Sequence, residues 1–381
     1  MNDHTTGRHA RRGLNRRGFL AAAGLTAVGT AVATTVQASA GSAGAASAFR
    51  APAEEVRHTR TWMAWPDRTA IWGRDLSGVQ ADIALIARTI AKYEPVVMCA
   101  NSAGAAKARS MCGSTVTVIS SILVDDCWMR DTGPVFRTDG SGGLDAVGLN
   151  FNGWGDKQAH ARDALVAERI AAYAGVKFTS ADLVGEGGAI EQDGAGTLMA
   201  TRSSLLNSNR NPGMSQSALE TAMCDAYGAT KVIWFDGVKG QDITDDHVDA
   251  TSRFLRPGEA LVQMPLASDN DAFAKDARQQ YQILSTSKTA TGTAMTVAKL
   301  QGPDYDKIRS TNRNFLASYA NYYLCNGAVI CAHFGDTAAD RAAKATLARL
   351  HPDRVVEQLN IDSLGTGGGG IHCVTQQQPA A

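Results

Sequence analysis

Residues 78–99, GVQADIALIARTIAKYEPVVMC, place an amphipathic segment directly before a short apolar run. The apolar residues of the first part recur on one helical face, at Val79, Ile83, Ile86 and Ile90. This spacing predicts a helix over 78–93, and the apolar run at 95–99 indicates a buried strand. A helix followed at once by a buried strand is the repeating unit of α/β proteins.

The same alternation continues along the chain. A second helix is predicted over 159–174 and is followed by a strand at 176–178. Further strands are predicted at 262–264 and 329–332. Asp336 is a suitable N-cap for a last helix that runs to Leu350. The prediction is an α/β fold, and because no linker rich in Pro, Gly or Ser divides residues 50–378, we expect one domain over 50–381.

Composition and charge describe an ordinary soluble protein. Of the 381 residues, 44% are hydrophobic and 19% are charged, and the net charge is zero. Residues 1–40 carry five Arg and one Asp, so the remainder is mildly acidic. An acidic body predicts no nucleic-acid partner and no anionic membrane surface, and it suits a small cationic ligand.

The first 40 residues are typical of a targeting segment. Arg16 and Arg17 precede a long uncharged stretch that is rich in Ala, Gly and Thr and ends near Ala38-Ser39-Ala40, a pattern similar to a twin-arginine export signal with its cleavage site. The alternative is a membrane anchor, but the stretch has little Leu, Ile or Phe. We expect a cleaved signal over 1–40, a linker over 41–49, secretion, and no stable membrane association after cleavage.

The chain has seven cysteines, so they cannot all pair within one chain. A cysteine is more often a small buried hydrophobic residue than a reactive group, and five of the seven lie in apolar or helical contexts: Cys99, Cys112, Cys224, Cys325 and Cys331. Cys373 instead follows a run of four glycines, and it is the candidate nucleophile.

Four polar clusters contain the candidate site residues, at 125–134, 185–188, 244–249 and 365–373. Together they fit the chemistry of a guanidinium group, which is planar and cationic and is bound bidentately by carboxylates. The candidate carboxylates are Asp131, Glu186 and Asp249. A thiolate at Cys373 could attack the central carbon, and His247 could serve as the acid and base. The glycines, including Gly369 and Gly370, would let the backbone approach a ligand closely.

Other interpretations of these motifs fit the sequence less well. The Gly365-x-Gly367-x-x-Gly370 spacing has the letters of a dinucleotide site but lacks the βαβ context. Residues 245–249 have the D-x-H-x-D spacing of binuclear manganese ureohydrolases, without a second ligand segment. A papain-like protease would need a helix to support the thiolate, and none is predicted after Cys373. A guanidine-binding protein that has lost turnover is the remaining alternative.

The motifs resemble those of agmatine deiminases and, more distantly, of bacterial-type peptidylarginine deiminases. The segments that carry the resemblance are spread in order over residues 58–379: WMAWPDR (62–68), DDCWMRDTGP (125–134), NFNGWG (150–155), GEGGAIEQDGAGTLMATRSSLLNSNRNPG (185–213), HVD (247–249), SYAN (318–321) and GGGGIHCVTQQQP (367–379).

The resemblance implies the pentein fold, a pseudo-fivefold ring of α/β units around a central site. It implies that Cys373 forms a covalent amidino-thioether, that His247 is the acid and base, and that Asp131 and Asp249 clamp the guanidinium together with Glu186. It also implies no metal or cofactor and a homodimer. The expected substrate is agmatine, with free or peptidyl arginine as the alternative.

Further site residues are expected around this set. Trp65, Trp128 and Trp154, with Trp62, could form a wall over the substrate, and Asn321, Gly369 and Gly370 could line the site. Asp125 and Asp126 are interpreted as structural residues that hold their loop or pair with Arg130. His372 is expected to face away, because neighbours on an extended segment point to opposite sides.

Four positions depart from the usual family pattern. Asp246 stands where the family has Gly, Ala250 stands where it has Asn, Gly370 stands where Asn is common, and Arg60 lies in a segment that usually reads His-Glu-Gly. We expect Arg60 or Lys157 to supply a cation if the substrate carries a carboxylate.

Overall fold

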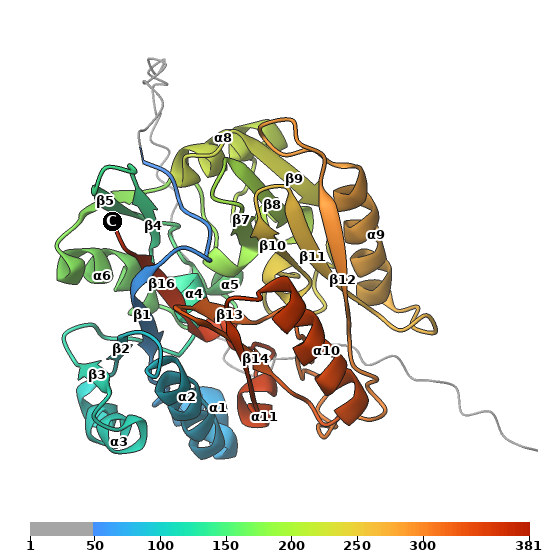
Figure 1. Ribbon diagram of the computed structural model, residues 1–381. Coiled ribbons are helices and arrows are strands. Elements are labelled where there is room, and N and C mark those ends of the chain that lie inside the picture. The colour runs from blue at the N-terminus through green and yellow to red at the C-terminus, as the bar shows by residue number, and fades with distance from the viewer. Residues whose placement is uncertain (1–48) are drawn as a thin grey trace, which may run out of the picture.

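The computed structural model describes residues 49–381 (Figure 1). The predicted signal over 1–40, and residues 41–48 of the predicted linker, lie outside the described residues.

The described strands form five separate sheets, one of four strands and four of three. The four-stranded sheet joins distant parts of the chain. In it, β16 (Gln376–Pro379) pairs antiparallel with β1 (His58–Ala64), and β1 pairs parallel with β2 (Val96–Cys99). The sheet ends with β3 (Val116–Ile119), which is parallel to β2.

Each three-stranded sheet has the same topology, an antiparallel pair followed by a third strand parallel to the second. The twelve strands of these sheets are β4 (Val135–Thr138), β5 (Leu144–Gly148) and β6 (Lys177–Ser180), then β7 (Ile190–Gln192), β8 (Thr197–Thr201) and β9 (Lys231–Phe235), then β10 (Ser252–Arg256), β11 (Glu259–Met264) and β12 (Thr296–Gln301), and finally β13 (Tyr323–Cys325), β14 (Ala328–Ala332) and β15 (Val355–Leu359).

A parallel pair needs a crossover connection, and a helix supplies it in every sheet. These longer helices are α2 (Leu76–Ile90), α3 (Ser102–Cys112), α6 (Val166–Ala174), α8 (Gln216–Tyr227), α9 (Ala272–Thr286) and α10 (Thr337–Leu350). The short helices are α1 (Thr69–Trp72), α4 (Met129–Thr132), α5 (Gly153–Asp156), α7 (Arg202–Leu205) and α11 (Asp362–Gly365).

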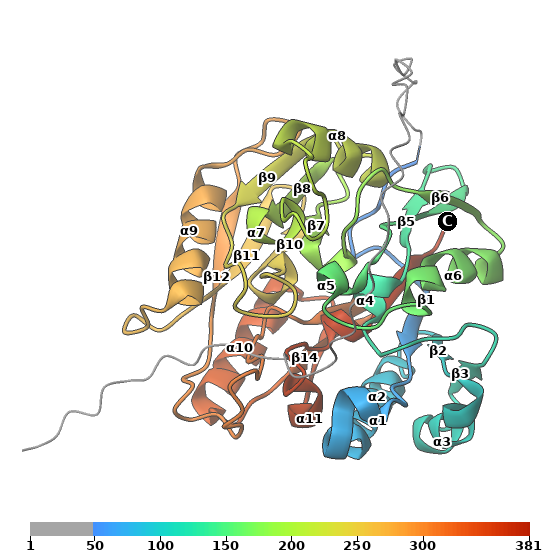
Figure 2. The same cartoon turned by 180° about the vertical axis from the view of Figure 1, so that it is seen from behind.

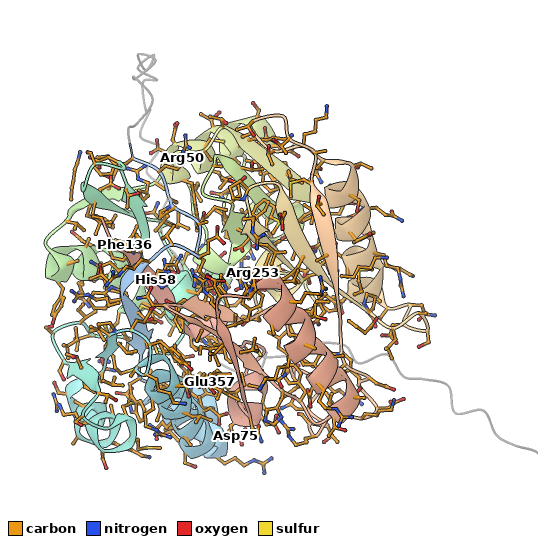
Figure 3. The ribbon with its side chains drawn as sticks, in the orientation of Figure 1. Arg50, His58, Asp75, Phe136, Arg253 and Glu357 are labelled. Atoms are coloured by element: carbon orange, nitrogen blue, oxygen red, sulfur yellow. The ribbon has the colours of Figure 1, made fainter. Side chains whose placement is uncertain are left out.

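The five units follow one another around a centre, with the longer helices on the outside (Figure 1), and the view from behind shows the same ring (Figure 2). This arrangement confirms the predicted α/β class and the pseudo-fivefold ring. The centre is not purely apolar, because Arg253 lies there, 1% exposed, while Asp75 lies at the outer edge (Figure 3). Within residues 49–381, the helices are all too short or too polar to cross a membrane.

The local predictions hold where the pattern is strong. The predicted helix at 78–93 is α2, and Asp336 caps α10 by accepting a hydrogen bond from the Ala339 amide at 3.2 Å. The helix predicted from residue 159 begins only at Val166. Residues 163–165 form a 3₁₀ turn instead, and the Asp125 carboxylate holds the start of this turn by accepting hydrogen bonds from the amides of Arg162 and Asp163.

Candidate active site

The candidate site residues occupy equivalent places in the five units. Each lies in the turn just before the first strand of its unit's antiparallel pair, which are β4, β7, β10, β13 and β16. These residues are Asp131 in α4, Glu186 before the 3₁₀ turn η3 (Gly187–Ala189), His247 and Asp249 at η4 (Val248–Ala250), Asn321 before β13, and Cys373 in η5 (His372–Val374). The ring symmetry therefore brings together groups that are far apart in the sequence.

Gly188 marks the point where three of these groups meet. A Cβ atom at Gly188 would lie 2.7 Å from His247 Nδ1, 2.8 Å from Asp131 Oδ1 and 3.1 Å from Asp249 Oδ2. The Gly188 amide also donates a hydrogen bond to Asp131 Oδ1 at 3.0 Å. Only glycine leaves room for the two carboxylates and the imidazole to converge here.

Cys373 lies beside this point and is half-buried. Asn321 Nδ2 is 3.2 Å from Cys373 Sγ, and Asp249 Oδ2 is 3.8 Å from it. Burial, together with the negative charges of Asp249 and Asp131, raises the pKa of the Cys373 thiol well above its ordinary value. The nucleophile is therefore a thiol at neutral pH until a cation enters the site.

His247 is held between two carboxylates. Its Nε2 atom is 3.3 Å from Glu186 Oε2, and its Nδ1 atom is 3.7 Å from Asp131 Oδ1. Burial alone would lower the pKa of His247, but Asp131 and Glu186 outweigh burial and raise it to about 9. His247 is thus protonated at neutral pH and can donate a proton to a leaving group.

The two carboxylates beside the nucleophile differ in their ionisation. Burial, with Glu186 and Asp249 nearby, raises the pKa of Asp131 to about 6. Burial also opposes the ionisation of Asp249, but His372 outweighs it and lowers the pKa of Asp249. Asp249 Oδ1 is buried without a hydrogen-bond partner, so it is available to a ligand.

The aromatic residues divide into two groups. Trp154 donates a hydrogen bond from Nε1 to Asp131 Oδ2 at 3.0 Å, and the Trp128 ring lies so close to Gly369 that a Cβ there would be 2.2 Å from it. Trp62 and Trp65 have no exposed surface, and Trp65 packs against Gly104 of α3. Both rings pack into the apolar core, so the structure does not place Trp62 and Trp65 along the substrate as expected.

Glu186 requires the same correction. Its side chain has no exposed surface, and both oxygens are engaged, Oε1 by Arg210 Nε at 2.9 Å and Oε2 by His247. Burial would raise the pKa of Glu186, but Arg210 and His247 outweigh it and lower the pKa. Glu186 therefore holds His247 in place and does not clamp the guanidinium directly.

Asn321 and the glycines lie against the nucleophile. A Cβ on Gly370 would be 2.5 Å from Asn321 Oδ1, which also accepts a hydrogen bond from the His372 amide at 3.1 Å. An Asn at position 370, which is common in the family, would therefore collide with Asn321 in this arrangement. The close approach of Asn321 explains why this chain has Gly at that position.

The segment with manganese-enzyme spacing has other partners. Asp245 Oδ2 contacts Arg210 at 2.7 Å and Lys157 at 2.6 Å. Across residues 49–381, His, Cys, Asp and Glu side chains form no group of three or more that could hold a metal ion.

Asp125 and Asp126 are structural residues, as predicted: Asp125 pairs with Arg68 at 2.6 Å, and Asp126 accepts a hydrogen bond from Trp72. The alternative pairing with Arg130 was wrong, because Arg130 pairs with Glu54 at 3.2 Å. His372 was expected to face away from an extended segment, but that segment is a 3₁₀ turn. There, His372 Nδ1 contacts Asp249 Oδ2 at 2.7 Å.

Two functional residues were missed. Arg210 lies within a stretch already noted for its resemblance, but its Asn-rich context gave no sign that it is fully buried against Glu186 and Asp245. Glu54 lies before the first strand in a segment without periodicity. The residues around it do not indicate that it is a buried ion-pair partner.

Comparisons with known proteins agree with this geometry. Residues 50–379 match the family model described as Porphyromonas-type peptidyl-arginine deiminase. A Streptomyces coelicolor protein, provisionally assigned as an agmatine deiminase, is 39% identical over 342 residues, which cover 87% of this chain and 99% of that protein. The agmatine deiminase of Pseudomonas aeruginosa is 34% identical over 354 residues, covering 87% and 96% of the two chains.

A solved structure has the same arrangement. The agmatine deiminase of Enterococcus faecalis superposes with a TM-score of 0.81 at 29% identity, covering 87% of this chain and 96% of that one. The ring of five units, the convergent side chains and these matches lead to one conclusion: the chain belongs to the Porphyromonas-type peptidyl-arginine deiminase family.

Proposed function

We propose that this protein hydrolyses agmatine to N-carbamoylputrescine and ammonia. The observation that carries the proposal is the convergence of Asp131, Asp249 and His247 on one point beside the Cys373 thiol. The identity to agmatine deiminases over nearly the whole described chain supports it.

The first half of the reaction forms a covalent intermediate. The guanidinium binds between Asp131 and Asp249, and its positive charge offsets the two carboxylates that keep Cys373 protonated. The thiol proton passes to solvent, and the sulfur attacks the central carbon to give a neutral tetrahedral adduct. His247 then donates a proton to one NH₂ group, the C–N bond breaks, and ammonia leaves.

The second half releases the product. In the amidino-thioether, the alkyl chain is still attached to the nitrogen that carried it in the substrate. His247, now neutral, takes a proton from a water molecule that attacks the same carbon. The C–S bond breaks with its electron pair returning to sulfur, the hydroxyl proton of the adduct restores the thiol, and the neutral ureido product leaves. One water molecule is consumed and one ammonia is formed for each turnover.

Agmatine is favoured over arginine because Lys157, one of the two cations expected to hold a carboxylate, is already paired with Asp245 at 2.6 Å. A substrate carboxylate would have to displace that contact to reach Lys157.

The test is to incubate the purified protein with agmatine, with arginine and with a peptide that ends in arginine, and to measure ammonia, ureido product and urea with and without a chelator. We expect ammonia and N-carbamoylputrescine in equal amounts, unaffected by the chelator. Cys373→Ser should abolish both, and Cys224→Ser, which removes another half-buried thiol, should leave both unchanged.

Other outcomes would assign a different function. Urea that disappears with the chelator and persists in Cys373→Ser would mean a metal-dependent ureohydrolase. Tight binding of agmatine without any product would mean a guanidine-binding protein. A higher kcat/KM for arginine or the peptide would move the substrate to the arginine class.

We also propose export through the twin-arginine-type segment and assembly as a homodimer. Replacing Arg16 and Arg17 by Lys should keep the protein inside the cell, whereas unchanged export would refute this signal. Light scattering of the mature protein should give twice the monomer mass, and a monomer mass would refute the dimer.

A further inference from the structure

We infer that Glu54, on the segment before β1, positions His372 and, through His372, also Asp249. A residue outside the site therefore fixes the orientation of the guanidinium clamp and the position of the nucleophile. This inference rests on the proposed function. Glu54 and His372 are positioning residues in it, since they act on the substrate through Asp249.

The segment that carries Glu54 is anchored to two successive units of the ring. Arg50 exchanges backbone hydrogen bonds with Thr138 of β4, each at 2.9 Å, and the Ala51 amide donates to the Tyr227 carbonyl at 2.9 Å. From there the segment leads to β1 in a different unit, crossing near the centre of the ring (Figure 1).

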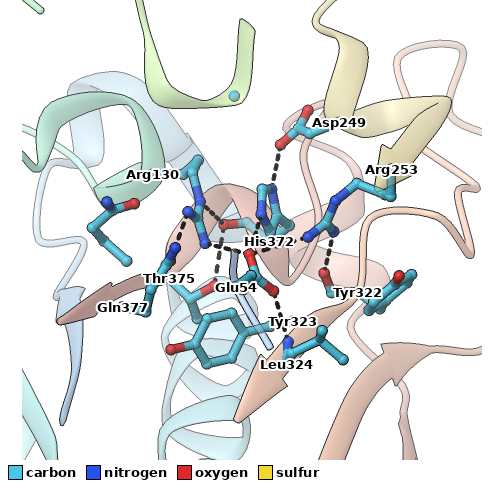
Figure 4. A network of polar contacts seen from close by, with 12 residues as sticks. Glu54, Arg130, Asp249, Arg253, Tyr322, Tyr323, Leu324, His372, Thr375 and Gln377 are labelled. Atoms are coloured by element: carbon cyan, nitrogen blue, oxygen red, sulfur yellow. Dashed lines mark hydrogen bonds and ion pairs between the residues drawn. The ribbon is translucent and has the colours of Figure 1, made fainter. Parts of the chain in front are cut away.

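At the centre, Glu54 contacts four of the five units (Figure 4). Its Oε2 atom contacts Arg130 at 3.2 Å, Arg253 at 3.0 Å and His372 at 2.8 Å, and its Oε1 atom accepts a hydrogen bond from the Leu324 amide at 2.8 Å. One carboxylate thus ties together the turn before β4, the strands β10 and β13, and the turn before β16.

His372 links this hub to the clamp. Its Nε2 atom faces Glu54 Oε2 at 2.8 Å, and its Nδ1 atom faces Asp249 Oδ2 at 2.7 Å. An ionised carboxylate only accepts hydrogen bonds, so both contacts are satisfied when both ring nitrogens carry a proton. His372 therefore bridges two carboxylates, and its ring orientation fixes that of Asp249.

This link engages Asp249 Oδ2, the oxygen that lies 3.8 Å from Cys373 Sγ, and it leaves the other oxygen open. Because His372 occupies Oδ2, the buried Oδ1 is left without a partner and is available to the guanidinium. His372 and Cys373 are neighbours in the same 3₁₀ turn, so a displaced His372 would disturb the nucleophile and the clamp together.

The first test compares two buried glutamates of similar surroundings. Glu94 resembles Glu54, since it accepts a hydrogen bond from a backbone amide, Asn326 at 2.7 Å, and contacts a histidine, His58 at 3.2 Å. Glu54→Gln should fold, because Arg130 keeps Gln377 and Arg253 keeps Glu191 as acceptors.

We expect Glu54→Gln to lower kcat/KM for agmatine about 10- to 100-fold, the effect of losing a hydrogen bond to a charged group. Glu94→Gln should lower the melting temperature about as much as Glu54→Gln does, and it should leave kcat/KM for agmatine unchanged. Equal kcat/KM in the two variants would overturn the inference.

The second test separates the two contacts of His372. The amide nitrogen of Asn can take the place of Nδ1, and that of Gln can take the place of Nε2. His372→Asn keeps the donor to Asp249 and should retain more activity than His372→Gln, which keeps only the contact to Glu54. The reverse order would overturn the inference.

A third measurement does not depend on turnover. The cationic reagent 2-chloroacetamidine and the neutral reagent iodoacetamide both alkylate Cys373, where sulfur displaces halide and the thiol proton passes to solvent. Peptide mass spectrometry gives the rate at Cys373 for each. The ratio of cationic to neutral rates should fall about 10-fold in His372→Gln and in Glu54→Gln, and not in Glu94→Gln.

This ratio separates the two proposals. If the wild type converts no guanidine, the proposed function fails, and the ratio still decides whether Glu54 and His372 set the clamp. If the wild type is active and the ratio is the same in all variants, the inference fails and the proposed function stands.

Discussion

Replacing Glu186 by Gln should move both limbs of the pH profile to lower pH. In the wild type we expect activity to rise as Asp131 ionises, at a pKa of about 6, and to fall as His247 loses its proton, at a pKa of about 9. Glu186 raises both values because its negative charge lies 3.3 Å from His247 and close to Asp131. Removing that charge lowers both.

The size of the shift follows from the contact between Glu186 and His247. A hydrogen bond between charged groups contributes about 1.5–3 kcal/mol, and about 1.4 kcal/mol corresponds to one pKa unit. The alkaline limb should therefore fall by about one to two units, to between pH ~7 and ~8. Asp131 stays 3.7 Å from His247 in the variant, so part of the elevation remains.

The assay is kcat/KM for agmatine, measured by ammonia release from pH 5 to pH 10.5. Glu94→Gln is the control for the loss of a buried carboxylate away from the site, and its limbs should match those of the wild type. A folded Glu186→Gln protein with an unchanged alkaline limb would refute the assignment of that limb to His247 and of Glu186 as its partner.

Three further predictions follow from the same geometry. Gly188→Ala should lower kcat/KM at least about 100-fold at near-normal stability, because the added Cβ would displace His247, Asp131 and Asp249; wild-type activity would contradict their convergence. Trp154→Phe removes a hydrogen bond that lowers the pKa of Asp131, so the acid limb should move about one unit above 6, and a shift to lower pH would contradict this. The pKa of His247 rises on folding from 6.5 to about 9, so its stabilisation is fully present below pH 6.5 and is lost as pH rises through about 9. Urea unfolding of the wild type and of His247→Gln at pH 6 and pH 9.5 should show a difference that shrinks by about 3 kcal/mol at the higher pH, and a constant difference would contradict the raised pKa.

The sequence predicted those parts of the fold that depend on local pattern. The helical spacing of Val79 to Ile90 and the cap at Asp336 depend only on residues close in the sequence, so the sequence alone predicts them. The start of α6 was not predicted, because the turn before it is held by Asp125, which lies far away in the chain.

The site residues were recognised by motif, but their roles depend on burial. Glu186 and Trp65 have no exposed surface because other parts of the chain cover them, and the residues next to them in the sequence do not predict this burial. Glu54 and Arg210 escaped notice for a related reason. Each is a charged residue in an irregular segment, where a solvent-exposed position is the usual expectation.

The pairing of β1 with β16 has a consequence for how the enzyme comes into being. The register joins His58 to Pro379, so the first unit lacks a strand until the far end of the chain arrives. The entropy cost of closing so large a loop grows only slowly with its length, so the length of the loop adds little to the cost of pairing β1 with β16. Cys373 is carried by the turn before β16. The strands of the other four units are all synthesised before β16, and a chain that ends before Cys373 lacks the nucleophile and is inert towards every guanidine it meets.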